Sequence, residues 1–290
     1  MTTLDPRRHA YRPDLADARL RGQVTAERFV EGRLMRVAVP LLSVVAHGQP
    51  DQPLTSQALL GEDVLVFDEC GGWAFVQLKR DGYVGYIERC ALSDDLPPIT
   101  HHVTALATQI YSRATIKSVV RNSLPFGSRL SGVVHDGFLQ LADHGWIPEQ
   151  HVELANQAAS DYVTVALQMV GTPYLWGGKT PGGIDCSGLV QVSMQAAGFS
   201  PPRDSDMQAA EIGRALRPTE WHNLQRGDLI CWRGHIGIMT DADTLLHANA
   251  HHMAVTLEPL ADVTARAATK GSDIEAIRRP VGRCATPSGT

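Results

Sequence analysis

The chain has 290 residues, of which 43% are hydrophobic and 20% are charged. This composition is typical of a globular protein with room for about two domains, or three if some are small. The formal net charge of −5 argues against the concentrated basic face that nucleic-acid binding needs, so we expect no such partner. Residues 1–22 lack a signal-peptide pattern, and no run reaches the ~20 apolar residues of a membrane helix. We therefore expect a cytoplasmic protein with no membrane partner.

The five cysteines are far apart in the sequence, at positions 70, 90, 186, 231 and 284. No two of them form a CxxC pair, so we expect no metal site and no cofactor. Cys70 and Cys90 could approach each other across a small barrel, but a reducing compartment disfavours a bond between them. Cys231 lies in an apolar run and is predicted to be a buried strand residue.

Short strands are expected in the first half of the chain. Residues 1–24 show no sustained apolar period and are predicted to form an N-terminal arm. In residues 25–97, apolar runs alternate with tight turns such as Asp81-Gly82, which predicts a small β-barrel. The runs are Val37, Val39 and Leu41 in alternation, then residues 64–67, 73–78 and 83–87.

After Pro97-Pro98 the pattern of short strands repeats more weakly, which predicts a second barrel over residues 98–156. Residues 157–284 then change character, because helices are expected before strands. One helix is predicted after Ser160-Asp161, a second from Asp185 to Gly198, and a third over residues 206–216. Strands follow from residue 229 onward. Helices followed by an antiparallel sheet indicate an α+β domain.

Cys186 is the residue that most strongly suggests chemistry. It stands between glycines in Ile184-Asp185-Cys186-Ser187-Gly188, where a helix is predicted to begin. Backbone N–H groups and the dipole at a helix start favour a thiolate and can bind an oxyanion. An isolated cysteine is more often a small buried apolar residue, so the case for a nucleophile depends on a base nearby.

His235 and His247 are the candidate base and its orienting partner. Two strands joined by a turn near Asp241 place both side chains on one face, either directly opposite or as diagonal neighbours. Either histidine could be the inner base. His251-His252 suggests zinc as an alternative, but adjacent residues on a strand point to opposite faces, so we disfavour it.

The sequence resembles the NlpC-type peptidases of bacterial cell-wall metabolism, which have a papain-like fold. The resemblance is carried by Gly171–Gly178, Asp185–Val190, Pro202–Gln208, Gly227–Leu229 and His235–Ile238, in that order. The two preceding barrels resemble bacterial SH3-like domains, as in the γ-D-glutamyl-L-diamino acid endopeptidases.

The resemblance implies a role for each matching residue. Cys186 would attack the substrate carbonyl, His235 would carry the proton, His247 would orient it, and the Tyr174 hydroxyl would help to bind the oxyanion. The resemblance assigns substrate binding to five further residues: Tyr83, Trp176, Asp185, Ser187 and Ser205. Of these, Asp185 and Ser187 would hold the free amine, an ammonium group, at the L-alanine end of the substrate. Asp185 could instead serve only as a helix cap, and the aromatic residues could be core residues.

The resemblance therefore implies hydrolysis of the bond between γ-D-glutamate and a diamino acid in free murein tri- or tetrapeptides. The substrate would start with L-alanine, and the diamino acid would be meso-diaminopimelate or lysine, with preference for the former. One alternative is a peptidoglycan-binding protein with an inactive peptidase domain. Another is a papain-like amidase or acyltransferase that acts on a different substrate.

Overall fold

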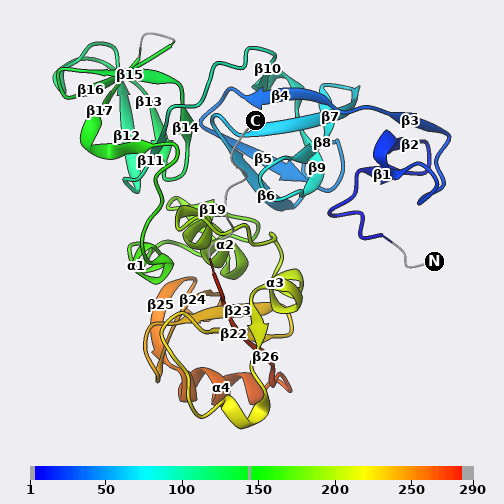
Figure 1. The fold of residues 1–290 in the computed structure, drawn as a ribbon, viewed down its shortest axis with the longest axis vertical. Coiled ribbons are helices and arrows are strands. Elements are labelled where there is room, and N and C mark those ends of the chain that lie inside the picture. The colour runs from blue at the N-terminus through cyan, green and yellow to red at the C-terminus, as the bar shows by residue number, and fades with distance from the viewer. Residues whose placement is uncertain (1–3, 143–144, 283–290) are drawn as a thin grey trace. The chain divides into compact units, whose positions relative to one another are not determined.

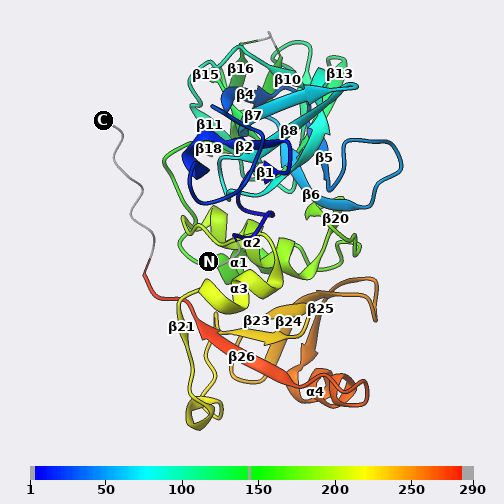
Figure 2. The same ribbon diagram turned by 90° about the vertical axis from the view of Figure 1, so that its right-hand side faces the viewer.

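The computed structural model describes residues 4–142 and 145–282, and the chain divides into two compact units, residues 1–157 and 158–290. Within the described residues, the first unit is built of strands and the second contains the α-helices (Figures 1 and 2). Cys284 lies outside the described residues. Cys70 and Cys90 are free and exposed.

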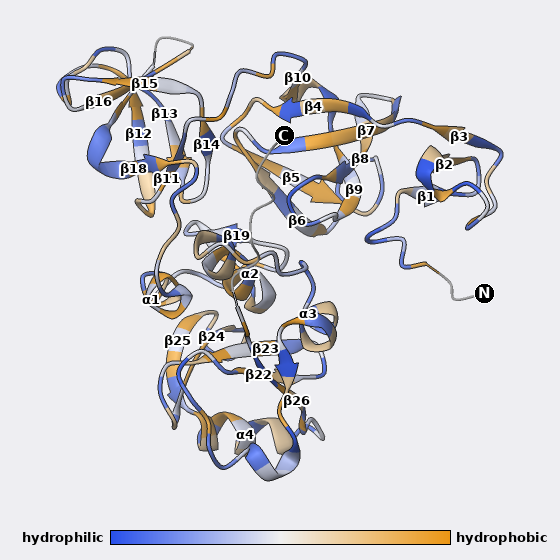
Figure 3. Ribbon diagram, viewed as in Figure 1, coloured by the Kyte–Doolittle hydropathy of each residue, from blue (hydrophilic) through white to orange (hydrophobic). Residues whose placement is uncertain are grey.

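A seven-stranded antiparallel sheet dominates the first unit, with the order β10-β4-β7-β8-β9-β5-β6. Its strands are β4 (Arg33–Val37), β5 (Leu41–Val45), β6 (Leu54–Leu59), β7 (Asp63–Cys70), β8 (Trp73–Leu78), β9 (Val84–Glu88) and β10 (Leu92–Ser93). Hydrophobic residues run along β5 and β7 (Figure 3). Val39 does not continue a strand as predicted. The chain turns there because Pro40 has no N–H to donate to a ladder.

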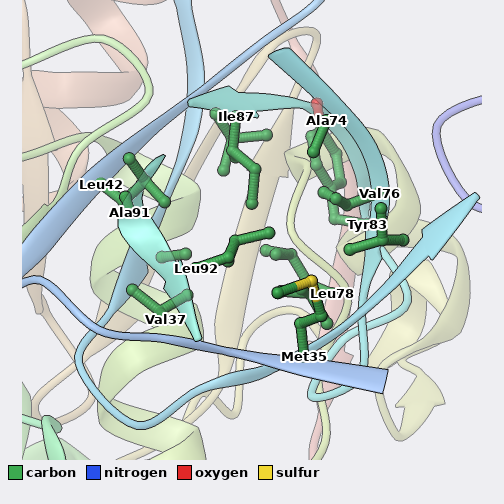
Figure 4. Packing of buried hydrophobic residues seen from close by; sticks show 14 residues of the cluster. Met35, Val37, Leu42, Ala74, Val76, Leu78, Tyr83, Ile87, Ala91 and Leu92 are labelled. Atoms are coloured by element: carbon green, nitrogen blue, oxygen red, sulfur yellow. The ribbon is translucent and has the colours of Figure 1, made fainter. Parts of the chain in front are cut away.

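Tyr83 belongs to the hydrophobic core of this sheet. Only 5% of its surface is exposed, and it packs in one cluster with Met35, Val76, Leu78 and other buried side chains (Figure 4). A side chain buried in this way contributes to packing. Tyr83 therefore contributes to the core, and its predicted contact with substrate stays a prediction.

The N-terminal arm contributes β1 (Tyr11–Arg12) and β2 (Leu15–Asp17) to a small sheet that β3 (Arg28–Val30) completes. Ala10 and Leu15 are buried in a cluster with Phe67 and Phe75 of the large sheet. The arm is therefore part of the core of the first unit.

The remainder of the first unit consists of two smaller antiparallel sheets. One contains β11 (His101–Val103), β14 (Arg129–Leu130) and β18 (Val152–Leu154); the other contains β12 (Ala107–Tyr111), β13 (Val120–Pro125), β15 (Gly132–His135), β16 (Phe138–Leu141) and β17 (Trp146–Pro148). The Arg129 N–H donates to the Leu60 carbonyl at 2.8 Å. Gly61 has a φ of +80° and no space for a Cβ against the Arg129 carbonyl, so glycine permits this close approach.

The second unit contains a six-stranded antiparallel sheet with the order β21-β26-β22-β23-β24-β25. Its strands are β21 (Arg214–Ala215), β22 (Leu229–Trp232), β23 (His235–Met239), β24 (Thr244–Asn249), β25 (Ala254–Pro259) and β26 (Ile274–Arg279). The helices are α1 (Tyr162–Leu167), α2 (Cys186–Ala196), α3 (Ser205–Glu211) and α4 (Leu260–Ala268), and a short hairpin joins β19 (Lys179–Thr180) to β20 (Gly183–Ile184). Both views show α1, α2 and α3 on one side of the sheet and α4 on the other (Figures 1 and 2).

The helix predicted over residues 206–216 is shorter than expected. It ends at Glu211 because Gly213 takes a φ of +52° and the chain then pairs with β26 as β21. Cys231 has no exposed surface, in agreement with its predicted place in a buried strand.

Candidate active site

Cys186 is the first residue of α2, where Asp185 is the N-cap. An oxygen of Asp185 accepts the Gly188 N–H at 2.6 Å. Gly188 lies so close to the Gly178 carbonyl that a Cβ would collide with it. The loop before the helix is thus pressed onto the first turn, and this contact fixes the backbone that carries the thiol. The N–H of Cys186 is one of those at a helix start that have no partner inside the helix.

Asp185 forms a buried ion pair with Arg203, which no pattern in the sequence predicted. Arg203 Nη2 lies 2.7 Å from Asp185 Oδ2, and Nη1 lies 3.0 Å from Oδ1. Ser187 Oγ accepts from Arg203 Nη1 at 2.8 Å, and the Gly177 N–H donates to Asp185 at 2.8 Å. Asp185 therefore already has a counter-charge. The ammonium-binding role that the resemblance assigns to it stays a prediction.

The thiol of Cys186 lies beside the start of β23. The backbone N–H groups of Ile236 and Ser187 donate toward its sulfur, and Ile236 directly follows His235 in the chain. Only 6% of Cys186 is exposed. Folding therefore brings the nucleophile and the candidate base to the same strand end.

The two histidines are diagonal neighbours on adjacent strands. Ile238 pairs with Leu246 and Met239 with Leu245, which is the second of the two registers considered from the sequence. His235 Nε2 lies 2.8 Å from His247 Nδ1. His235 is therefore left with one ring nitrogen for Cys186, and His247 takes the orienting position.

Glu258 is a further polar side chain at the site. Its Oε2 lies 2.7 Å from His247 Nε2, and Arg266 of α4 contacts the same oxygen at 2.9 Å. No pattern in the sequence pointed to Glu258. Glu258 pairs with Leu245, two residues before His247. Side chains two residues apart on a strand share a face, so a known β24–β25 register would have placed Glu258 beside His247.

Burial disfavours a lone charge on either member of the catalytic pair. Burial, followed by the nearby Asp185 carboxylate, raises the pKa of Cys186 to about 12. Burial and the neighbouring His247 lower the pKa of His235 to about 3. Before any proton transfer, Cys186 is therefore a neutral thiol and not the thiolate expected at a helix start. Proton transfer from sulfur to imidazole creates both charges together, so each compensates the other.

Tyr174 is half-buried close to Cys186. Burial, followed by the charges of Cys186 and Asp185, raises the pKa of Tyr174 above its usual range, so its hydroxyl stays protonated and can donate. Trp176 is 66% exposed, and Ser205 begins α3. Tyr83 lies in the other unit.

No group of three or more metal-ligating side chains gathers in residues 4–142 and 145–282. His252, which suggested zinc, instead lies 3.3 Å from Glu258 Oε1. Nor does any helix in these ranges have the length and apolar character to cross a bilayer.

Two family models match the chain. Residues 171–271 match the NlpC/P60 family, and residues 45–92 match the bacterial dipeptidyl-peptidase SH3 domain. The chain is 27% identical to the γ-D-glutamyl-L-lysine dipeptidyl-peptidase of Bacillus subtilis over 68% of this chain and 73% of that protein. It is 26% identical to dipeptidyl-peptidase 6 of Lysinibacillus sphaericus over 74% and 88% of the two chains.

The crystal structure of an NlpC/P60 family protein from Bacillus cereus has the same fold. It superimposes with a TM-score of 0.72 at 20% identity and covers 86% of this chain and all of the other. Fold and site together define a papain-like cysteine peptidase. The chain carries a domain that matches the NlpC/P60 family, preceded by one that matches the bacterial dipeptidyl-peptidase SH3 domain, and it is a cysteine peptidase.

Proposed function

We propose that the protein cleaves the bond between γ-D-glutamate and the following diamino acid in free murein peptides that begin with L-alanine. The observation that carries the proposal is the catalytic pair. Cys186 begins α2 beside the strand that starts with His235, and His247 holds the far side of that imidazole at 2.8 Å. The names of the relatives in B. subtilis and L. sphaericus support a dipeptidyl-peptidase.

The reaction would proceed in two steps. His235 takes the proton of the Cys186 thiol while the sulfur attacks the γ-carbonyl carbon, and the carbonyl oxygen becomes an oxyanion. The N–H of Cys186 and the hydroxyl of Tyr174 stabilise that oxyanion. The carbon–nitrogen bond then breaks, and the amine leaves with the proton from His235. Water hydrolyses the thioester and restores the thiol.

The decisive experiment is an assay on L-Ala-γ-D-Glu-meso-diaminopimelate, with wild type compared to Cys186→Ala. Wild type should release L-Ala-γ-D-Glu, and the variant should not. An inactive wild type or an active variant would refute the proposal. The same peptide with L-lysine as the third residue shows which diamino acid is preferred, and we propose meso-diaminopimelate.

A second candidate function keeps the chemistry but changes the substrate to that of an amidase or acyltransferase. The buried ion pair of Asp185 with Arg203 supports this second function, because the carboxylate predicted to bind the substrate ammonium already has a counter-charge. N-acetylation of the test peptide separates the two. Loss of cleavage indicates that the free amine is recognised, and unchanged cleavage indicates another substrate class.

We further propose that the small sheets of residues 98–156 form a second SH3-like barrel and that the enzyme recycles wall peptides in the cytoplasm. The first proposal rests on the repeated pattern of short strands. The second rests on the proposed substrate, because free murein peptides are the material that recycling of the wall would consume. Fractionation of the native host with an antibody against the protein tests the location.

A further inference from the structure

Glu258 ends a continuous series of hydrogen bonds that starts at His235. His235 Nε2 contacts His247 Nδ1 at 2.8 Å, and His247 Nε2 contacts Glu258 Oε2 at 2.7 Å. Arg266 Nη2 holds the same oxygen at 2.9 Å, and His252 Nε2 lies 3.3 Å from the other one. Both ring nitrogens of His247 are therefore engaged. Only Nδ1 of His235 is free of this series.

The charge on Glu258 decides where the protons of the series lie. Partial burial would raise the pKa of Glu258, but hydrogen bonds from His247, His252 and Arg266 lower it to about 2. The carboxylate is therefore ionised at neutral pH and only accepts hydrogen bonds. The proton between it and His247 must be on Nε2 of that ring.

Each remaining proton position follows from the previous one. Burial lowers the pKa of His247, so the ring is neutral at pH 7 and carries a single proton. Since that proton is on Nε2, its Nδ1 has a lone pair and accepts. His235 must then donate from Nε2. Its Nδ1 has no proton and is the only ring nitrogen that remains for Cys186.

We propose that Glu258 is a positioning residue that acts through His247 to fix the tautomer of His235, and so leaves Nδ1 as the acceptor of the Cys186 proton. The proposal rests on the proposed function, because the tautomer matters only if Cys186 is the nucleophile. Glu258 touches neither the substrate nor the thiol. Its effect passes entirely through the orientation and protonation of the two rings.

The same series offsets the charge that appears during the reaction. When Nδ1 of His235 takes the thiol proton and the sulfur–carbon bond forms, the ring becomes a cation. Its Nε2–H still donates to His247, so no second proton has to move. The carboxylate of Glu258 lies beyond His247 and compensates the new charge, while Arg266 keeps that carboxylate ionised. The proton on Nδ1 then leaves with the amine.

The first test measures cleavage kinetics of the full-length protein on L-Ala-γ-D-Glu-meso-diaminopimelate. Glu258→Ala should lower kcat about 10- to 100-fold with little change in KM, because the substrate is not touched. Glu258→Asp retains an acceptor and should recover part of the rate. Glu275→Ala on β26 is the matched control, since Glu275 is exposed and outside the series. A kcat for Glu258→Ala equal to that of wild type would overturn the proposal.

The second test reads the tautomers directly and does not depend on activity. Two-bond ¹H–¹⁵N spectra of the histidine-labelled wild-type protein at pH 7.5 distinguish Nε2–H from Nδ1–H rings. His235→Gln and His247→Gln variants assign the signals. Both rings should be of the Nε2–H form, and a wild-type His235 protonated on Nδ1 would overturn the assignment. If wild type cleaves no such peptide, the proposed function fails, and these spectra still decide the tautomer.

Discussion

At the scale of single residues, the site depends on charges that are buried only as pairs. Arg203 and Asp185 have side chains 1% and 9% exposed, and they are joined at 2.7 Å. Taking two ions out of water is costly, and the cost is offset by their mutual attraction and by further hydrogen bonds. Ser187 and two backbone N–H groups supply those bonds, so the pair holds the thiol-bearing turn in place.

Arg203→Met should therefore destabilise the protein strongly. It leaves the Asp185 carboxylate buried without its partner, which typically costs about 3–5 kcal/mol. The free energy of unfolding in urea measures the loss. Arg217→Met is the matched control, because Arg217 is 80% exposed and pairs with Glu220 only at the surface. Its effect should stay below about 1 kcal/mol. Equal losses of unfolding free energy in both variants would show that the buried pair contributes no more to stability than a surface pair.

Tyr174 is expected to act on the transition state. Tyr174→Phe removes one oxyanion donor and keeps the ring, so kcat should fall about 100-fold while KM changes little. Steady-state kinetics on the tripeptide provide the comparison. Tyr11→Phe serves as the control, because the Tyr11 hydroxyl donates only to the Leu4 carbonyl in the N-terminal arm. An unchanged kcat for Tyr174→Phe would remove this residue from the oxyanion site.

At the scale of elements, the start of α2 is defined by close backbone contact as much as by its cap. Gly188→Ala should lower the melting temperature and the activity together, because the new Cβ would collide with the Gly178 carbonyl. Overpacking of this kind costs about 1–3 kcal/mol. Gly182→Ala is the control, since a Cβ there meets only Thr180 Oγ1 at 3.5 Å. Thermal unfolding that is identical for the two variants would contradict the proposed contact.

The elements also show where sequence patterns were sufficient and where they were not. Asp161 and Asp185 cap α1 and α2 as predicted, because a cap is a local interaction between a side chain and the next N–H groups. β13 could not be predicted because its residues are mostly exposed and show no apolar alternation. α4 was missed as well, although it supplies Arg266 to the active site.

At the scale of the whole molecule, carboxylates paired with arginine make stability depend on pH. Partial burial would raise the pKa of Asp161 and of Asp68, but hydrogen bonds from arginine lower both. The pKa of Glu258 is lowered to about 2. The unfolded chain therefore binds more protons than the folded chain between the folded pKa values and about 4.5. Burial of neutral His235 also lowers stability as the pH falls below about 6.5, because the ring of the unfolded chain is protonated there while the buried ring stays neutral.

The midpoint of thermal unfolding should accordingly be highest near neutral pH and should fall as the pH drops from about 6 to 3. Differential scanning calorimetry in matched ionic strength measures it. Glu258→Ala should show a weaker fall between pH 5 and 3 than wild type, because it removes one of the titrating groups. A wild-type midpoint that stays constant over this range would contradict the sign of these shifts.

The sequence by itself determined the local features: the cap at Asp185, the thiol at the helix start, and two histidines that share a strand face. These follow from side-chain identity and from periods of 3.6 and two residues, which act over short distances. Only the tertiary structure decided the diagonal register of the histidines, the Arg203 counter-charge and the core position of Tyr83. It also brought Glu258 and Arg266 to His247. These depend on which strands and helices pack together, and that is set by burial across the whole domain.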